Sequence, residues 1–389
     1  MIKEKIIKPL SGNFYNETRH KLLNLIEEKN LDGFLITNPA NIFYFTGFFY
    51  VTNERPSGFY LSRNNISKLF IPLLEKENAE SLKVNEVHIY EEFPGDISPY
   101  TFMANMISEK RIGTDIKNID ILNLIKKNFE ELNHSTGVEK FRYVKHDEEI
   151  NLIIEASKYA DLSLEYLKEC AKDMISQNVS ERELVKICTE YAKNKMLNNI
   201  SKDFDETPCN VVATIHSGPR GAFPHGKSLS KVPNKNETLI CGVGACIGGV
   251  YAESGVTFIL GEPNEDQKKI MQVMKEVNNE VVKSLKEGSI CEDVNKVASS
   301  IYLDYGLNKF VRHRIGHGMG FEGHEAPWLS PGDKTLLTKN MVFSNEPGIY
   351  RPGIDGYRTI SSMIVDKEKG IQIPNFLDKN IEERIINLN

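Results

Sequence analysis

Side chains that could do acid–base or metal chemistry gather in four short segments of the second half of the chain, each beside glycine or proline. The segments read SGPRGAFPHGKSLS, YAES, RHRIGHGMGFEGHEAPWL and VFSNEPGIY. Their candidate side chains are His225, Glu253, His313, His317, His324 and Glu346. A lone histidine beside a strand is usually a hydrogen-bonding residue, but a glycine-rich run with three histidines leaves room for a substrate. We therefore expect a functional site on loops over a rigid sheet, with imidazoles available for proton transfer.

Two regions with different patterns must position these segments. In the first region, the spacing of apolar residues predicts a helix over 15–30. Short apolar runs predict strands at 31–37, 67–73 and 86–92, and the start of another at 110–115. The first of these runs is expected to end in a turn at Asn38-Pro39. Strands interleaved with helices indicate an α/β domain over residues 1–143.

The second region opens with helical periodicity and continues with glycine-bounded strand runs. Helices are expected over 150–167, 180–196, 264–288 and 291–307. Ser180 and Glu183 have the spacing of a capping box, and Gly288 is expected to stop the third helix. Strand runs lie at 210–218, 238–261, 341–350 and 357–370. These elements indicate a second domain over residues 144–389.

The composition excludes several classes of protein. A chain of 389 residues is too long for one ordinary core, so two domains are expected. The net charge of -6 provides no basic surface for nucleic acid or anionic lipid. No secretion signal and no long apolar run is visible, and the six cysteines are scattered, which is typical of reduced thiols. We expect a cytoplasmic protein, with a minor role left open for Cys241 and Cys246 beside the suspected site.

The combined motifs resemble a known superfamily. GHGMGFEGHEAPWL followed by MVFSNEPGIYRPG, with SGPRGAFPHG upstream, is similar to the pita-bread group of Xaa-Pro aminopeptidases, prolidases, methionine aminopeptidases and creatinase. LDGFLITNPANIFYFTGF and VKHDEEINLIIEASKYAD resemble the N-terminal domain and the lead into the catalytic domain. The resemblance implies an α/β creatinase/prolidase-type domain over 1–143 and an α+β pita-bread domain over 144–389.

The resemblance also implies a metal site that this sequence does not complete. Metallopeptidases of the group hold two ions with two Asp, one His and two Glu. Carried over, the His falls on His317 and one Glu on Glu346, while the two Asp fall on Gly242 and Glu253. The last Glu falls on Ile360. Since Gly242 and Ile360 cannot coordinate, we expect no cofactor, or one Mn, Zn or Fe ion on Glu253, His317 and Glu346.

The leading hypothesis is a hydrolase of a C–N bond in a small, carboxylate-bearing amide, peptide or amidine. His225 would transfer the proton, with Glu253 and Glu346 orienting it and stabilising positive charge. His317 and His324 would bind and polarise the substrate. FFYVTNERPSGFY resembles the creatinase segment that presents an arginine to the substrate carboxylate, here Arg55; the alternative is a surface arginine. Creatinase's own strand glutamate would fall on Gly255, so the match to creatinase is incomplete.

Two alternatives stay open. One is a metal-dependent Xaa-Pro dipeptidase or aminopeptidase with a mononuclear site. The other is a non-catalytic pita-bread protein that binds a peptide or protein partner. Related two-domain members imply a homodimer in which Arg55 reaches the other subunit's site, with a dipeptide or small-molecule substrate and neither nucleic acid nor membrane as partner.

Overall fold

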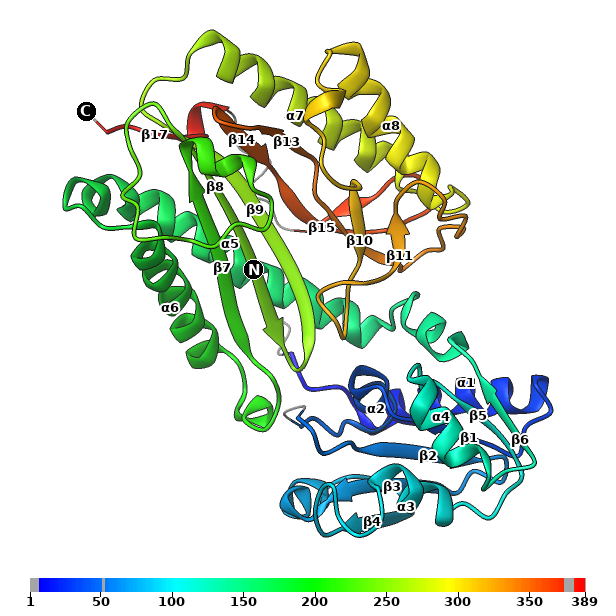
Figure 1. Cartoon of the computed structure of the whole chain (residues 1–389). Helices are drawn as coiled ribbons and strands as arrows, with labels where there is room; N and C mark the ends of the chain where they lie inside the picture. Colours follow the sequence, from blue (N-terminus) through cyan, green and yellow to red (C-terminus); the bar gives the residue numbers. More distant parts are fainter. Residues whose placement is uncertain (1–6, 51–52, 374–380, 389) are drawn as a thin grey trace. The chain divides into compact units, whose positions relative to one another are not determined.

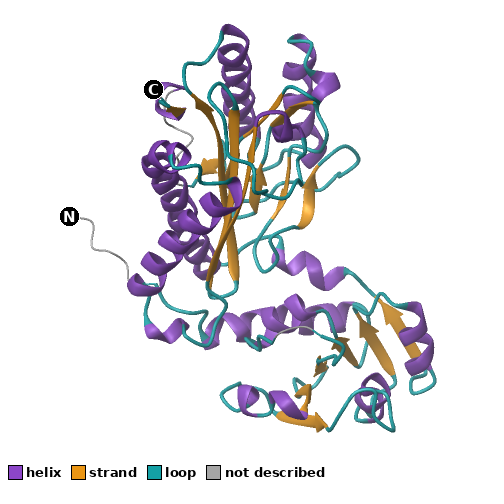
Figure 2. Cartoon of the chain, turned by 60° about the vertical axis from the view of Figure 1, so that its left-hand side comes forward, coloured by secondary structure: helices purple, strands orange, loops and turns teal. Residues whose placement is uncertain are grey.

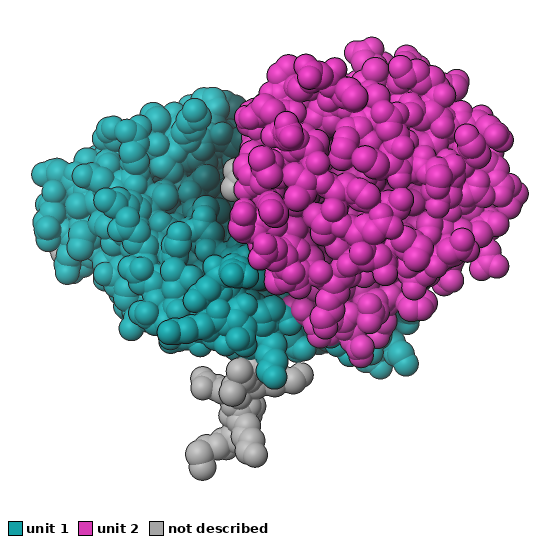
Figure 3. Space-filling view, turned by 90° about the horizontal axis from the view of Figure 1, so that it is seen from below, with its two compact units in different colours: residues 1–9, 143–389 teal, residues 10–142 magenta. Residues whose placement is uncertain are grey.

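The chain divides into two compact units, which are coloured separately in Figure 3. The computed structural model describes residues 7–50, 53–373 and 381–388. The N-terminal unit is Leu10–Arg142, and the C-terminal unit is Tyr143–Asn389 together with Met1–Pro9. The domain boundary expected after residue 143 stays a prediction. The two units are described one at a time below.

The N-terminal unit contains a mixed six-stranded sheet with the order β4-β3-β2-β1-β5-β6. Its strands are β1 Gly33–Ile36, β2 Gly58–Ser62, β3 Ser67–Pro72, β4 Glu86–Tyr90, β5 Arg111–Thr114 and β6 Glu131–His134. Its helices are α1 Gly12–Glu28, α2 Pro39–Thr46, α3 Pro99–Asn105 and α4 Ile119–Lys126. The strands expected at 67–73, 86–92 and 110–115 are β3, β4 and β5, and the α/β class is as predicted.

The turn predicted at Asn38-Pro39 is wrong, because these residues start helix α2. The side chain of Asn38 accepts a hydrogen bond from the backbone N–H of Asn41, 3.1 Å away, and so caps the helix. Proline at the first helical position has no N–H to lose and has a suitable φ. The dipeptide thus carries both a turn signal and a helix-start signal, and the following apolar run decides between them.

Four long helices belong to the C-terminal unit: α5 Asp147–Ser176, α6 Glu181–Asn199, α7 Glu265–Ser284 and α8 Cys291–Asp304. The predicted capping box forms at α6, where Glu183 Oε2 accepts from the Ser180 backbone at 2.9 Å and from its hydroxyl at 2.7 Å. Helix α7 ends at Ser284, before Gly288, which instead forms a turn at φ +83°. The helix stop expected at Gly288 is therefore four residues too late.

A large sheet runs through the C-terminal unit with the order β11-β10-β12-β15-β9-β8-β7, and β16 and β17 join it on β15 and β9. The strands are β7 Asn210–Ser217, β8 Thr238–Ile247, β9 Val250–Leu260, β10 Gly316–Gly318, β11 Glu325–Leu329, β12 Val342–Asn345, β15 Ile360–Ile364, β16 Ile371–Gln372 and β17 Ile385–Ile386. A separate hairpin pairs β13 Gly348–Arg351 with β14 Asp355–Arg358. Helices α5 and α6 pack on β7–β9, and α7 packs beside α8 near the other half of the sheet (Figures 1 and 2).

The β8–β9 hairpin carries the first candidate site residue. Its two-residue turn is Gly248-Gly249, with φ values of +60° and +79°, which side chains with a Cβ rarely adopt. The register pairs Gly242 with Gly255 and Gly244 with Glu253. Since side chains alternate along a strand, these four positions share one face of the hairpin. The sheet therefore presents one carboxylate among three glycines.

Apolar side chains of α7 and α8 pack against the large sheet of the C-terminal unit. A buried cluster joins Met274 of α7 and Val294 of α8 to Phe343 of β12 and Met363 of β15.

Among the described residues, no helix combines the length and the apolar character needed to cross a bilayer.

Candidate active site

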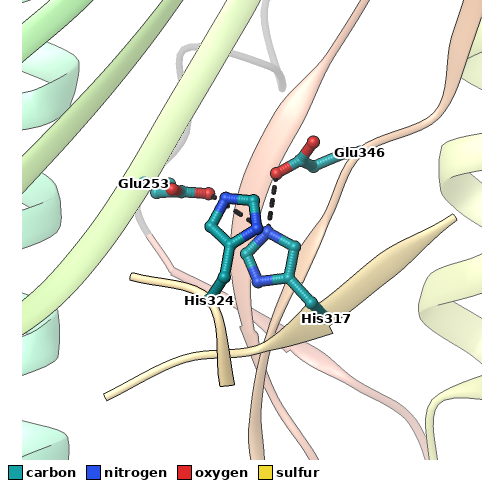
Figure 4. A group of neighbouring side chains, drawn as sticks. All are labelled: Glu253, His317, His324 and Glu346. Atoms are coloured by element: carbon teal, nitrogen blue, oxygen red, sulfur yellow. Dashed lines mark hydrogen bonds and ion pairs between the residues drawn. The ribbon is translucent and has the colours of Figure 1, made fainter. Parts of the chain in front are cut away.

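Four of the residues selected from the sequence meet in the C-terminal unit. Glu253 of β9, His317 of β10, His324 before β11 and Glu346 after β12 each offer one ligand atom, and these atoms lie within 4.8 Å of one another (Figure 4). His317 is buried, His324 is exposed, and the two glutamates are half-buried. Segments far apart in the sequence thus build one cluster.

Close backbone approach sets the position of His317. Strand β10 lies between β11 and β12, and His317 pairs with Ser344 while Gly316 pairs with Asn345. A Cβ on Gly316 would lie 2.1 Å from the Ser344 carbonyl oxygen. Only glycine fits there, so Gly316 of the GHG segment permits the pairing that brings His317 to Glu346.

Both ring nitrogens of His317 are engaged. Nε2 lies 2.9 Å from Glu346 Oε1 and 3.8 Å from Glu253 Oε2, and Nδ1 lies 3.0 Å from the Gly318 carbonyl oxygen. Burial alone would lower the pKa of His317, but the hydrogen bond and charge of Glu346 outweigh it and raise the pKa. His317 therefore acts as a cation that donates to Glu346.

The two glutamates have opposite environments. Burial and the negative charge of Glu346 raise the pKa of Glu253 to about 7. Burial would raise the pKa of Glu346 as well, but the hydrogen bond and charge of His317, with the charge of Arg358, hold it well below its ordinary range. Two neighbouring carboxyl groups with separated pKa values are typical of acid–base sites.

Ser344 links the two carboxyl groups. Its hydroxyl oxygen lies 2.8 Å from Glu253 Oε2 and 3.2 Å from Glu346 Oε1. A hydroxyl has one hydrogen, so it can donate to only one carboxylate at a time. Both contacts are favourable when Glu253 is protonated and donates to Ser344, which then donates to Glu346.

His324 forms the exposed side of the cluster. Its ring stacks on that of His317 with centroids 3.8 Å apart and planes 18° apart. Partial burial lowers the pKa of His324, and the positive charge of His317 lowers it further. Within the described parts of the chain His324 makes no hydrogen bond, so its ring is available to a ligand.

The space beside Gly242 and Ile360, where the resemblance places two further ligands, is occupied by other protein atoms. Ile360 of β15 pairs with Gly255, and its side chain is 6% exposed. A Cβ on Gly255 would lie 2.8 Å from Ile360 Cδ1, and a Cβ on Gly242 would lie 3.0 Å from the same atom and 3.1 Å from Arg358 Nη2. An apolar side chain and a guanidinium thus take the space where ligands would have to be. A dinuclear centre does not fit these residues.

The Ile360 side chain therefore fits only because Gly242 and Gly255 have no Cβ. Gly255→Ala should destabilise the C-terminal unit by about 1–3 kcal/mol, because its Cβ would meet Ile360 and, at 2.9 Å, the Cys241 carbonyl oxygen. Gly244→Ala is the matched control on the same face, since its Cβ would make only a 3.5 Å contact. Urea unfolding followed by fluorescence of Trp328, the single tryptophan, measures both variants. Equal stability of the two would contradict the packing argument.

The other predicted site residues lie outside the four-residue cluster. His225 is exposed, and its charge is among the causes that lower the pKa values of His313 and His324, so it lies within electrostatic reach of the cluster. Arg55 belongs to the N-terminal unit, where its Nε donates to Glu92 at 2.7 Å and its Nη1 pairs with Glu54. Its predicted contact with a substrate stays a prediction.

Cys241 and Cys246 are buried and free. Burial raises the pKa of Cys241 well above its ordinary value and that of Cys246 to about 12, so neither thiol readily becomes a thiolate nucleophile or ligand. Cys241 and Gly242 are successive residues of β8, so the Cys241 side chain points to the opposite face of the sheet from the Gly242 position. Its thiol therefore does not share the face on which Glu253 lies.

Sequence reasoning singled out His313 without giving it a role, and it did not predict Arg358 or Ser344. His313 accepts a hydrogen bond from the Tyr350 hydroxyl at 2.8 Å and donates to the Arg314 carbonyl at 2.7 Å. Arg358 and Ser344 likewise shape the site. Arg358 stands two residues before Ile360 and Ser344 stands in VFSNEPGIY, but neither residue type by itself indicated a role.

Comparisons with known proteins agree with the fold and the family. Residues 151–374 match the profile of metallopeptidase family M24, and residues 19–144 match the creatinase/prolidase N-terminal domain. The Xaa-Pro dipeptidase of Pyrococcus horikoshii is 28% identical over 363 residues, which cover 90% of this chain and 95% of that protein. The prolidase structure from Thermococcus sibiricus has a TM-score of 0.80 at 27% identity, covering 94% of this chain and 98% of that one.

One further structure shows how widely the fold is used. The N-terminal domain of FACT complex subunit SPT16 from chickpea has a TM-score of 0.79 at 15% identity, covering 96% of this chain and 99% of that one. Such a likeness shows the fold alone. The predicted two-part fold and hydrolase family are confirmed by the matches to the dipeptidases and to both family profiles. The chain belongs to metallopeptidase family M24, with a creatinase/prolidase-type N-terminal domain and a pita-bread C-terminal domain.

Proposed function

We propose that this chain hydrolyses a C–N bond in a small peptide, amide or amidine that carries a carboxylate, without a dinuclear metal centre. The observation that carries the proposal is the filling of the second-ion position by Ile360 and Arg358 beside an intact cluster of Glu253, His317, His324 and Glu346. Similarity to the Xaa-Pro dipeptidase of Pyrococcus horikoshii supports a dipeptide as the substrate class.

The cluster has the groups that hydrolysis needs. Glu346 stays ionised beside His317, so it is placed to accept a hydrogen bond from the attacking water and to stabilise developing positive charge. Because both ring nitrogens of His317 are engaged, positioning suits it better than substrate binding. His324 is the exposed imidazole available to the substrate carbonyl. His225 would take a proton from the water as it adds to the carbonyl carbon, and would return that proton to the leaving amine as the C–N bond breaks.

A second candidate is a mononuclear, metal-dependent Xaa-Pro dipeptidase. The observation in its favour is the four-donor set of two imidazoles and two carboxylates, which suits one Zn²⁺, Mn²⁺ or Fe²⁺ ion. Such an ion, when bound, would polarise the scissile carbonyl. The donor set thus fits one ion, although it does not fit two.

Metal content and turnover measured together separate these functions. The full chain is purified without chelator, dialysed against Mn²⁺ or Zn²⁺, and analysed by elemental mass spectrometry. It is then assayed on Ala-Pro, Gly-Pro and a panel of small amides and amidines. We expect no more than about one ion per chain and turnover that survives chelation. Turnover only with metal would favour the mononuclear dipeptidase.

Two other outcomes would count against the whole scheme. Two ions per chain would show that ligands other than Gly242 and Ile360 complete a dinuclear site. Binding of peptides without any turnover would favour a non-catalytic role. The expected cytoplasmic homodimer stays a prediction, and sedimentation velocity over a dilution series tests the dimer.

A further inference from the structure

Arg358 is a buried cation with an unusual set of partners. It is the last residue of β14 and is 7% exposed. Its Nη1 donates to the Pro224 carbonyl at 3.0 Å, and its Nε is buried without a hydrogen-bond partner among the described residues. No carboxylate of the described chain forms an ion pair with it. A charge held this way is costly unless nearby charges compensate it.

Backbone pairing brings Arg358 to the segment of Glu346, since Arg358 pairs with Gly348 and the Thr359 N–H donates to the Pro347 carbonyl at 3.1 Å. The positive charge of Arg358 is among the causes that lower the pKa of Glu346, which places the guanidinium within electrostatic reach of that carboxylate. A guanidinium keeps its proton at any ordinary pH, so its charge is permanent. Together with His317 it offsets the negative charge of Glu346. The site thus has a positive group beside its ionised carboxylate that does not depend on a bound ion.

The guanidinium of Arg358 lies beside Gly242, where the resemblance places a ligand that this chain lacks. Arg358 Nη2 lies 3.1 Å from the Cβ position of Gly242, where the first aspartate of a dinuclear site would stand. The same guanidinium holds Pro224, the residue before His225. One side chain therefore connects the emptied ligand position, the catalytic cluster and the segment that carries the expected proton donor.

We propose that the guanidinium of Arg358 takes the place of the second cation, supplying a built-in positive charge beside Glu346 and positioning the segment that bears His225. This role deepens the proposed function, because it explains how a cluster of two carboxylates works without a second ion. Arg358 is a positioning residue in this scheme. Its charge also opposes the binding of divalent cations to the cluster, and that effect can be measured without any substrate.

The test is the affinity of the full chain for Mn²⁺, measured by electron paramagnetic resonance. Arg358→Gln removes the charge but keeps a donor for Pro224, and we expect its Mn²⁺ affinity to rise by ~10-fold or more over wild type. Arg358→Lys keeps the charge and should stay close to wild type. Arg63→Met removes one positive charge from an exposed position of the N-terminal unit and controls for net charge.

A folded Arg358→Gln variant that binds Mn²⁺ no better than wild type would overturn the proposal. Gly242→Asp provides a second test that leaves Arg358 in place. The new carboxylate should pair with the guanidinium, so the variant should gain no Mn²⁺, and a gain of one ion per chain would contradict the proposal. If no substrate is ever hydrolysed, the proposed function fails, but the order of Mn²⁺ affinities still decides the role of Arg358.

Discussion

Replacing Glu346 by glutamine is expected to lower kcat/KM by about 10²- to 10⁴-fold, the range in which general acid–base groups contribute. Glutamine has nearly the same shape and can still accept the hydrogen bond from His317 Nε2, now 2.9 Å from Glu346 Oε1. It has no negative charge with which to orient the attacking water and stabilise developing positive charge. The loss should therefore appear mainly in kcat, because the contacts that bind the substrate are retained.

The measurement is steady-state hydrolysis of whichever peptide or amide the screen identifies, by wild type and variant at one pH. Glu190→Gln on α6 is the matched control, because that glutamate is largely exposed and lies on a helix that does not carry the cluster. Fluorescence of Trp328 verifies that the C-terminal unit is folded. A Glu346→Gln variant with wild-type kcat/KM would show that the negative charge of Glu346 is not needed for hydrolysis.

Local patterns were enough to predict much of the fold. Periodicity located α1 and the helices of the C-terminal unit, and the Ser180–Glu183 spacing located the start of α6. Local signals failed where two of them competed. Asn38-Pro39 is typical of a turn and also of a capped helix start. Gly288 predicted the end of α7, but the helix already ends at Ser284. Tertiary packing decides such cases.

The residue types of the site were predicted, but its charges and contacts were not. Glu253, His317, His324 and Glu346 stood out because histidines and glutamates gather beside glycine and proline in a few short segments. The use of both His317 nitrogens depends on the pairing of β10 with β12, which no local pattern reveals. Likewise, Gly242 and Ile360 were recognised as missing ligands, while the entry of Arg358 into that space required the three-dimensional arrangement.

A buried ion pair at the edge of the cluster accounts for the second large effect that we expect. Lys145, just before α5, pairs with Glu325, the first residue of β11, with Nζ and Oε1 2.7 Å apart. Their side chains are 1% and 3% exposed. Glu325 follows His324 directly, so the pair ties the exposed imidazole of the site to the start of the long helix.

Lys145→Met is expected to destabilise the C-terminal unit by about 3–5 kcal/mol, because it removes the cation that lies 2.7 Å from the buried carboxylate of Glu325. The matched control is Lys158→Met on α5. Its partner is Glu155, its side chain is 54% exposed, and its loss should cost less than about 1 kcal/mol. Urea unfolding followed by Trp328, which lies on the same strand as Glu325, measures both changes.

The double variant Lys145→Met/Glu325→Met separates charge from packing. The double variant removes both members of the pair and replaces them with apolar side chains, so it should recover most of the stability lost in Lys145→Met. If it is as unstable as the single variant, the cost lies in packing or in other contacts of the two side chains, and the ion pair is not what holds β11 in place. If it recovers stability but loses turnover, the pair serves chiefly to position His324.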